Sequence, residues 1–112
     1  MLTLYGIKNC DTVKKARRWL EDHGVDYQFH DFRQDGLDQK RLSDWVEQLG
    51  LEAILNKRST TWRNLSDNDK DISNNAQAIK LLLANPTLIK RPIAQNNKVL
   101  LVGFKEAEYK NI

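Results

Sequence analysis

The sequence contains one cysteine, two prolines and two histidines among 112 residues. A single cysteine excludes an internal disulfide, and the scattered histidines give no spacing that is typical of a zinc site. No apolar run is long enough to span a membrane, and the first ten residues lack the charged start and long apolar core of a signal peptide. We therefore expect a cytoplasmic protein whose cysteine stays a thiol, with no bound metal and no membrane partner.

The composition is that of an ordinary globular protein, with 40% hydrophobic and 29% charged residues. A chain of this length buries most of its apolar surface without disulfides or metals, so we expect a single domain over residues 1–112. There are 18 basic and 15 acidic residues, which gives a net charge of +3, and the two signs are interspersed. This pattern gives no reason to expect nucleic-acid binding.

Hydrophobic spacing predicts a strand, a helix and a second strand near the N-terminus. Residues 2–6 are mostly apolar and predict a strand, and the apolar residues of 11–23 recur at helical spacing until Gly24 ends the helix. Residues 25–30 alternate between apolar and polar, which is typical of a strand. A strand–helix–strand unit of this length has parallel strands and a right-handed crossover.

The middle of the chain is predicted to be helical. Asp38 is a good N-cap for a helix that Gly50 ends, and a short helical piece is expected near residues 52–55. A turn-rich stretch follows over 66–73, and a last helix with an apolar face ends before Pro86. We expect no strand in this region.

Strand patterns return in residues 88–94 and 98–102. They are joined by Gln95-Asn96-Asn97, whose asparagines tolerate the positive φ of a tight hairpin turn. A short helix is expected over 105–109. The element order β-α-β, helical block, β-β-α predicts an α/β, thioredoxin-like fold with a mixed four-stranded sheet and an all-helical insertion at about 38–86.

Cys10 follows the first strand and stands at the start of the first helix. A thiolate there faces backbone N–H groups that have no intrahelical partner, and the helix dipole favours its negative charge. The alternative is a small, buried and inert side chain. The strand–cysteine–helix setting favours a reactive thiol, so Cys10 is the candidate catalytic residue.

Three separated motifs resemble the arsenate reductase (ArsC) family, and more closely its YffB-like branch, with the Spx regulators as relatives. They are YGIKNCDTVKKA at 5–16, RSTTWRNL at 58–65 and IKRPI at 89–93. The resemblance implies a thioredoxin-like fold, a nucleophilic thiolate at Cys10 and a nearby basic residue at Arg91. It also implies a cis-proline at Pro92 beside the cysteine, whereas a trans proline at a strand edge is the alternative.

The predicted site combines Cys10 with polar and charged neighbours. Arg91 can pair with an oxyanion or carboxylate and stabilise the thiolate, while Lys8 adds positive charge that Asp11 opposes. Arg58 is the weakest candidate, because Asn56 takes the position of the arsenate reductase arginine and a solvated charged loop is the alternative. The predicted substrate- and glutathione-binding residues are Lys8, Asn9, Asp11, Thr12, Arg58, Arg91 and Pro92.

Departures from the family pattern bear on the substrate and the mechanism. Gly6 and Gly103 stand where arsenate reductases have a histidine and a substrate arginine, which argues against arsenate as the substrate. Val13 stands where a second cysteine would close a disulfide with Cys10, so an external thiol must resolve any covalent intermediate.

We therefore expect a monothiol reductase in which Cys10 attacks a small oxidised substrate and the mixed disulfide is resolved by an external thiol. Glutathione, as a co-substrate rather than a bound cofactor, or a glutaredoxin-type thiol is the expected partner. One alternative is an Spx-like regulator that binds RNA polymerase. Another is an arsenate reductase that uses glutathione or glutaredoxin.

Overall fold

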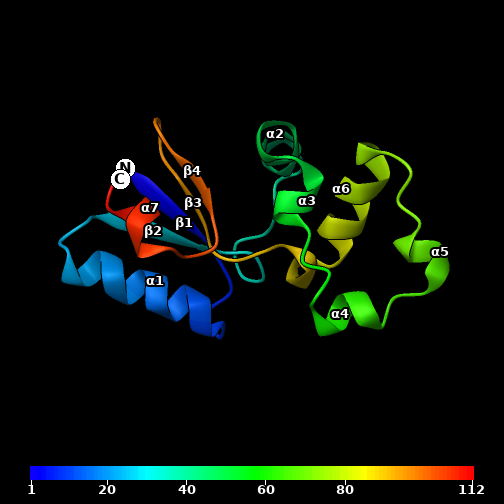
Figure 1. Ribbon diagram of the computed structural model, residues 1–112, viewed down its shortest axis with the longest axis horizontal. Helices are drawn as coiled ribbons and strands as arrows, with labels where there is room; N and C mark the ends of the chain where they lie inside the picture. Colours follow the sequence, from blue (N-terminus) through cyan, green and yellow to red (C-terminus); the bar gives the residue numbers. More distant parts are fainter. The chain divides into compact units, whose positions relative to one another are not determined.

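The computed structural model describes residues 1–112 and divides into two compact units (Figure 1). One unit consists of Met1–Gly36 and Arg91–Ile112, and the other of Leu37–Lys90. The first unit holds the sheet, and the second is built from helices. The single-domain organisation expected from the sequence stays a prediction. None of the helices has the length and apolar character that crossing a membrane requires.

The sheet has four strands in the order β2-β1-β3-β4. β1 pairs in parallel with β2, whereas the β1–β3 and β3–β4 pairs are antiparallel. The predicted mixed four-stranded sheet is therefore confirmed. The strands are β1 (Leu2–Gly6), β2 (Tyr27–Asp31), β3 (Ile93–Gln95) and β4 (Leu100–Val102).

Helix α1 (Asp11–Asp22) and the short α7 (Glu106–Tyr109) pack against the sheet (Figure 1). The buried residues of α1 are spaced three or four apart, which places them on one face of the helix. Gly24 adopts φ 66° just after the helix, a conformation that ends helices at little cost to glycine. The buried residues of this core are Leu2, Leu4, Ala16, Trp19, Leu20, Ala94 and Tyr109.

The second unit is helical, as predicted, apart from an isolated bridge between Leu55 and Ile89. Four of its helices begin at a polar residue whose side chain accepts a hydrogen bond from the backbone N–H three residues on, which satisfies an otherwise unpaired donor. These N-caps are Asp38, Ser59, Ser66 and Asn74. The elements are α2 (Gln39–Leu49), α3 (Leu51–Ile54), α4 (Thr60–Arg63), α5 (Asp67–Lys70), α6 (Asn75–Ala84) and the 3-10 helix η1 (Pro86–Leu88).

Two details of the C-terminal third differ from the prediction. The third strand begins at Ile93 rather than at residue 88, because Pro86 starts a 3-10 turn that includes Leu88. The hairpin turn contains no positive φ at an asparagine. Instead, Oδ1 of Asn96 accepts hydrogen bonds from the N–H groups of Lys98 and Val99, both at 2.8 Å, so a side chain closes the turn.

Gly6 lets the end of β1 approach α1 closely. A Cβ atom at this position would lie 2.7 Å from Cγ2 of Val13, a separation that real side chains do not tolerate. Val13 is fully buried, and its branched side chain has one strongly preferred rotamer in a helix. Val13 therefore occupies the space that a side chain at position 6 would need, and only glycine fits there.

We expect Gly6→Ala to lower the free energy of unfolding by about 1–3 kcal/mol, the usual cost of overpacking a core. Because the clash involves Val13, the double variant Gly6→Ala/Val13→Ala should be more stable than the sum of the single effects indicates. Urea unfolding of the four proteins measures this coupling. Additive effects would show that the Gly6–Val13 contact is not the cause.

Candidate functional site

Cys10 lies at the junction of the β1–α1 loop and helix α1, where it is the N-cap residue. Residues 7–10 form a turn in which the Cys10 N–H donates to the carbonyl of Ile7 at 3.2 Å. Cys10 is partly exposed, and its side chain makes no capping hydrogen bond by geometric criteria. The thiol nevertheless lies at the start of α1, where the N–H groups of the first helical turn have no intrahelical partner.

The pKa of Cys10 is lowered from the ordinary value of a thiol. Partial burial is the largest single influence and acts to raise the pKa, because it disfavours the charged thiolate. The backbone N–H of Val13, the hydrogen bond and positive charge of Arg91 and the N–H of Thr12 act in the opposite direction and together outweigh burial. The lowered pKa increases the fraction of thiolate, which is the nucleophilic form.

Arg91 and Pro92 reach this site from the segment that precedes β3. The Arg91–Pro92 peptide bond is cis, as the resemblance implies. Pro92 is buried, and its carbonyl accepts a hydrogen bond from the N–H of Gly103 at 2.8 Å. This segment brings the Arg91 guanidinium to Cys10, although 80 residues separate the two in sequence.

The other predicted binding residues are divided between the two units. Lys8 and Asn9 are exposed in the turn before Cys10, and Asp11 and Thr12 are exposed in the first turn of α1. Arg58 belongs to the second unit, where its backbone N–H donates to Oδ1 of Asn56 at 3.1 Å. The binding roles of all these side chains stay predictions.

Asp31, the last residue of β2, is a component of this region that the sequence analysis missed. It is the one buried charged side chain of the chain, with 3% of its surface exposed. Its Oδ1 accepts hydrogen bonds from the N–H groups of Arg33 at 2.7 Å and Gln34 at 3.3 Å. Its Oδ2 accepts one from the N–H of Lys8 at 3.3 Å, in the turn that ends at Cys10.

These contacts hold Asp31 in its charged form. Burial acts to raise the pKa of the Asp31 carboxyl, but the three N–H donors and the positive charge of Lys8 outweigh it and lower the pKa. One feature of the sequence could have identified Asp31 as part of the site: it is an aspartate at the end of a strand that was predicted to pair in parallel with β1. Such a position lies beside the loop that leaves the neighbouring strand.

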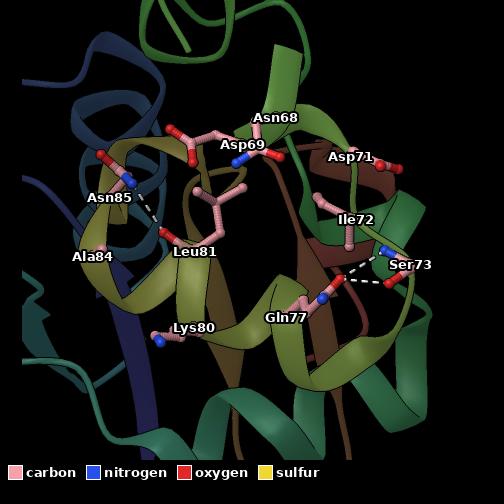
Figure 2. Close-up of a pocket in the computed structure, with 10 residues that line it drawn as sticks. All are labelled: Asn68, Asp69, Asp71, Ile72, Ser73, Gln77, Lys80, Leu81, Ala84 and Asn85. Atoms are coloured by element: carbon pink, nitrogen blue, oxygen red, sulfur yellow. Dashed lines mark hydrogen bonds between the residues drawn. The ribbon is translucent and has the colours of Figure 1, made fainter. Parts of the chain in front are cut away.

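A separate groove of about 630 Å³ is lined entirely by residues of the second unit (Figure 2). Gln77 closes part of it, because its Oε1 accepts hydrogen bonds from the N–H and Oγ of Ser73 at 2.9 and 2.6 Å. The groove contains none of the predicted site residues. Its lining residues are Asn68, Asp69, Asp71, Ile72, Ser73, Gln77, Lys80, Leu81, Ala84 and Asn85.

Comparison with known proteins gives a consistent set of relatives. The model of the ArsC family matches residues 5–112. A protein of Haemophilus influenzae is 51% identical over 109 residues, which cover 97% of this chain and 96% of that protein. The global transcriptional regulator Spx of Streptococcus mutans is 34% identical over 110 residues, which cover 96% of this chain and 80% of Spx.

A solved structure of a YFFB protein is 44% identical, with a TM-score of 0.94, and the match covers 99% of this chain and 97% of that one. Together with the observed sheet, this likeness confirms the predicted α/β, thioredoxin-like fold.

We expect Arg91→Met to raise the pKa of Cys10 by about one unit, because it removes a hydrogen-bond donor and a positive charge from the thiolate. The rate of alkylation by iodoacetamide, followed from pH 5 to 10, measures this pKa. Lys14→Met is the matched control, since it removes the same charge from an exposed position in the first turn of α1. Equal shifts in both variants would contradict a specific role for Arg91.

The lowered pKa of Asp31 also predicts how stability depends on pH. The unfolded chain binds the proton more readily than the folded one, so the stabilisation is fully present above the unfolded value of ~3.9 and is lost as the pH falls through the lower folded pKa. We expect Asp31→Asn to cost about 1.5–3 kcal/mol at pH 7, and this deficit should shrink at acid pH. Urea unfolding at pH 7 and pH 3 tests this, and a deficit that is independent of pH would contradict it.

Proposed function

Because the chain belongs to the ArsC family, we propose that it is a monothiol thiol reductase that uses glutathione and has Cys10 as its nucleophile. The observation that carries the proposal is a thiol of lowered pKa, placed between a helix N-terminus and Arg91, in a chain with no other cysteine. Family membership and the Spx relative support a thiol-based redox or regulatory role.

The first step is attack of the Cys10 thiolate on the glutathione sulfur of an oxidised substrate, a mixed disulfide with glutathione. A bond forms between Sγ of Cys10 and that sulfur while the original S–S bond breaks, and the departing sulfur leaves as a thiolate that takes a proton. The Val13 and Thr12 N–H groups and Arg91 favour the charged nucleophile before attack. Overall, the glutathionyl group passes from the substrate to Cys10, and the substrate sulfur is released as a free thiol.

In the second step, the thiolate of glutathione attacks the glutathione sulfur that is bound to Cys10. The mixed disulfide breaks, oxidised glutathione leaves, and Cys10 returns as a thiolate. The external thiol is required because Val13 stands where a second cysteine would act. Each turnover therefore converts one mixed disulfide and one glutathione into a free thiol and oxidised glutathione.

The predicted binding residues suit an anionic thiol such as glutathione. Its carboxylates match the guanidinium of Arg91 and the ammonium of Lys8. The side chains of Asn9 and Thr12 are exposed and offer polar groups to the ligand. The carboxylate of Asp11 limits the positive charge of the loop. Pro92 is buried and contributes an apolar side to the site.

The Spx relative supports a second candidate, a regulatory protein that docks on RNA polymerase. Val13 argues against a Cys-x-x-Cys redox switch in this chain, so the docking would not depend on formation of an internal disulfide. Arsenate reduction is a weaker candidate. Gly103 has φ 77° and no side chain where the resemblance to arsenate reductases requires an arginine.

Incubation with oxidised glutathione should produce a single glutathione adduct on Cys10, detected by mass spectrometry of the intact protein and its peptides. We expect the rate to rise with pH, with a midpoint at lower pH than for an unperturbed thiol, because the pKa of Cys10 is lowered. Arg91→Met should shift this profile to higher pH.

Cys10→Ser is the control for this experiment and should form no adduct. Turnover is then measured with a glutathionylated peptide, reduced glutathione and glutathione reductase. An adduct that forms without any turnover, together with capture of the RNA polymerase α subunit, would contradict the reductase and favour the regulator.

A further inference from the structure

We propose that Asp31 is a positioning residue for Cys10, because its buried carboxylate fixes the turn that carries the thiol to the start of α1. The inference rests on the proposed function only in taking Cys10 as the reacting group. Asp31 contacts neither the sulfur nor a substrate. It acts through the backbone of the turn at residues 7–10.

The hydrogen bonds of the turn link Asp31 to Cys10 in two steps. The N–H of Lys8 donates to Oδ2 of Asp31 at 3.3 Å, and Lys8 is the second residue of the turn. The N–H of Cys10, the last residue of the turn, donates to the carbonyl of Ile7 at 3.2 Å. A change in the position of Lys8 therefore changes the point at which Cys10 enters the helix.

Asp31 is itself held firmly, so it can serve as an anchor. Its N–H donates to Oδ2 of Asp35 at 3.0 Å, and its carbonyl accepts from the N–H of Asp35 at 2.8 Å. The next residue, Phe32, donates its N–H to the carbonyl of Gly6 at 2.9 Å, at the end of β1. The first part of the β1–α1 loop is thus tied to the end of β2 at two points, Gly6 and Lys8.

The chemistry of the contacts requires a carboxylate at this position. Three backbone N–H groups point at the two oxygens of a side chain that is 3% exposed, and a buried charge is tolerated only when its oxygens are occupied in this way. An asparagine can keep the two bonds of Oδ1 with Arg33 and Gln34. Its NH₂ group would then face the N–H of Lys8, so the bond to the turn is the one that is lost.

Asp31 could affect Cys10 in two ways, and the two predict opposite changes in the pKa of Cys10 when Asp31 is replaced. A negative charge acting through space would raise the pKa of Cys10, and its removal would lower that pKa. A positioning role predicts the reverse, because a displaced sulfur loses its favourable contact with the Val13 N–H and Arg91.

The test is the pH dependence of Cys10 alkylation by iodoacetamide in Asp31→Asn. We expect the pKa of Cys10 to rise by about one unit, which lowers the rate at neutral pH by about tenfold. Asp31→Glu should also raise it, since it keeps the charge but places the carboxylate differently. An unchanged or lowered pKa in Asp31→Asn would overturn the inference.

Asp35→Asn is the matched control. It removes the same charge from the same turn, but its remaining amide oxygen can still accept from the Asp31 N–H, so Asp31 stays anchored and we expect the pKa of Cys10 to stay within a few tenths of a unit of the wild-type value. A rise as large as that of Asp31→Asn would overturn the specific role of Asp31. Iodoacetamide needs no glutathione, so a failure here is distinct from a failure of the proposed reductase activity.

A measurement on the wild-type protein keeps the inference testable if Asp31→Asn does not fold. Backbone amide shifts are followed by NMR as the pH falls below ~3.9, where the Asp31 carboxyl takes up its proton. We expect the amide protons of Lys8 and Cys10 to shift together with the protonation of Asp31. If the Cys10 amide does not respond, the turn does not transmit the position of Asp31.

Discussion

The site depends on stabilising the negative charge of the Cys10 thiolate, although Cys10 is partly buried. Burial works against the charge on Cys10, and the N–H groups of the first turn of α1 together with Arg91 outweigh it. The N–H donors have fixed positions because they belong to a helix. This part of the stabilisation of the thiolate therefore needs no rearrangement when the sulfur reacts.

The rest of the first unit serves to bring those groups together. β1 leads to the turn, α1 supplies the N–H groups, and the segment before β3 supplies Arg91 from the far end of the chain. The antiparallel pairing of β3 with β1 places Ile93 opposite Tyr5, close in sequence to both halves of the site. Asp31 adds a third anchor from β2, so all three strands that surround the loop contribute to it.

Much of the fold could be predicted from the sequence, because hydrophobic spacing and cap residues act locally. The spacing from Val13 to Leu20 and the signals at Asp38 and Gly50 identified helices that the structure contains. The conformation of the hairpin turn was harder to predict, since an asparagine can close a turn by adopting positive φ or by accepting hydrogen bonds with its side chain. Asn96 uses the side chain, and spacing alone does not distinguish the two.

The candidate site was predictable in part. The helix-start position of Cys10 follows from local pattern, but its partnership with Arg91 came from the family resemblance, because spacing does not bring residues 10 and 91 together. Asp31 was missed for a physical reason. An aspartate at the end of a strand is usually solvated, and only the three-dimensional arrangement shows three N–H donors that make its burial favourable.

The contact between Gly6 and Val13 gives two departures from the family pattern a common origin. The resemblance to arsenate reductases places a histidine at position 6, and the resemblance to Spx places a cysteine at position 13. Here the valine fills the space that any side chain at position 6 would need. A side chain at position 6 and a valine at position 13 therefore exclude each other unless the interface repacks, so the lack of a second thiol in this chain is tied to volume in the β1–α1 interface as well as to redox chemistry.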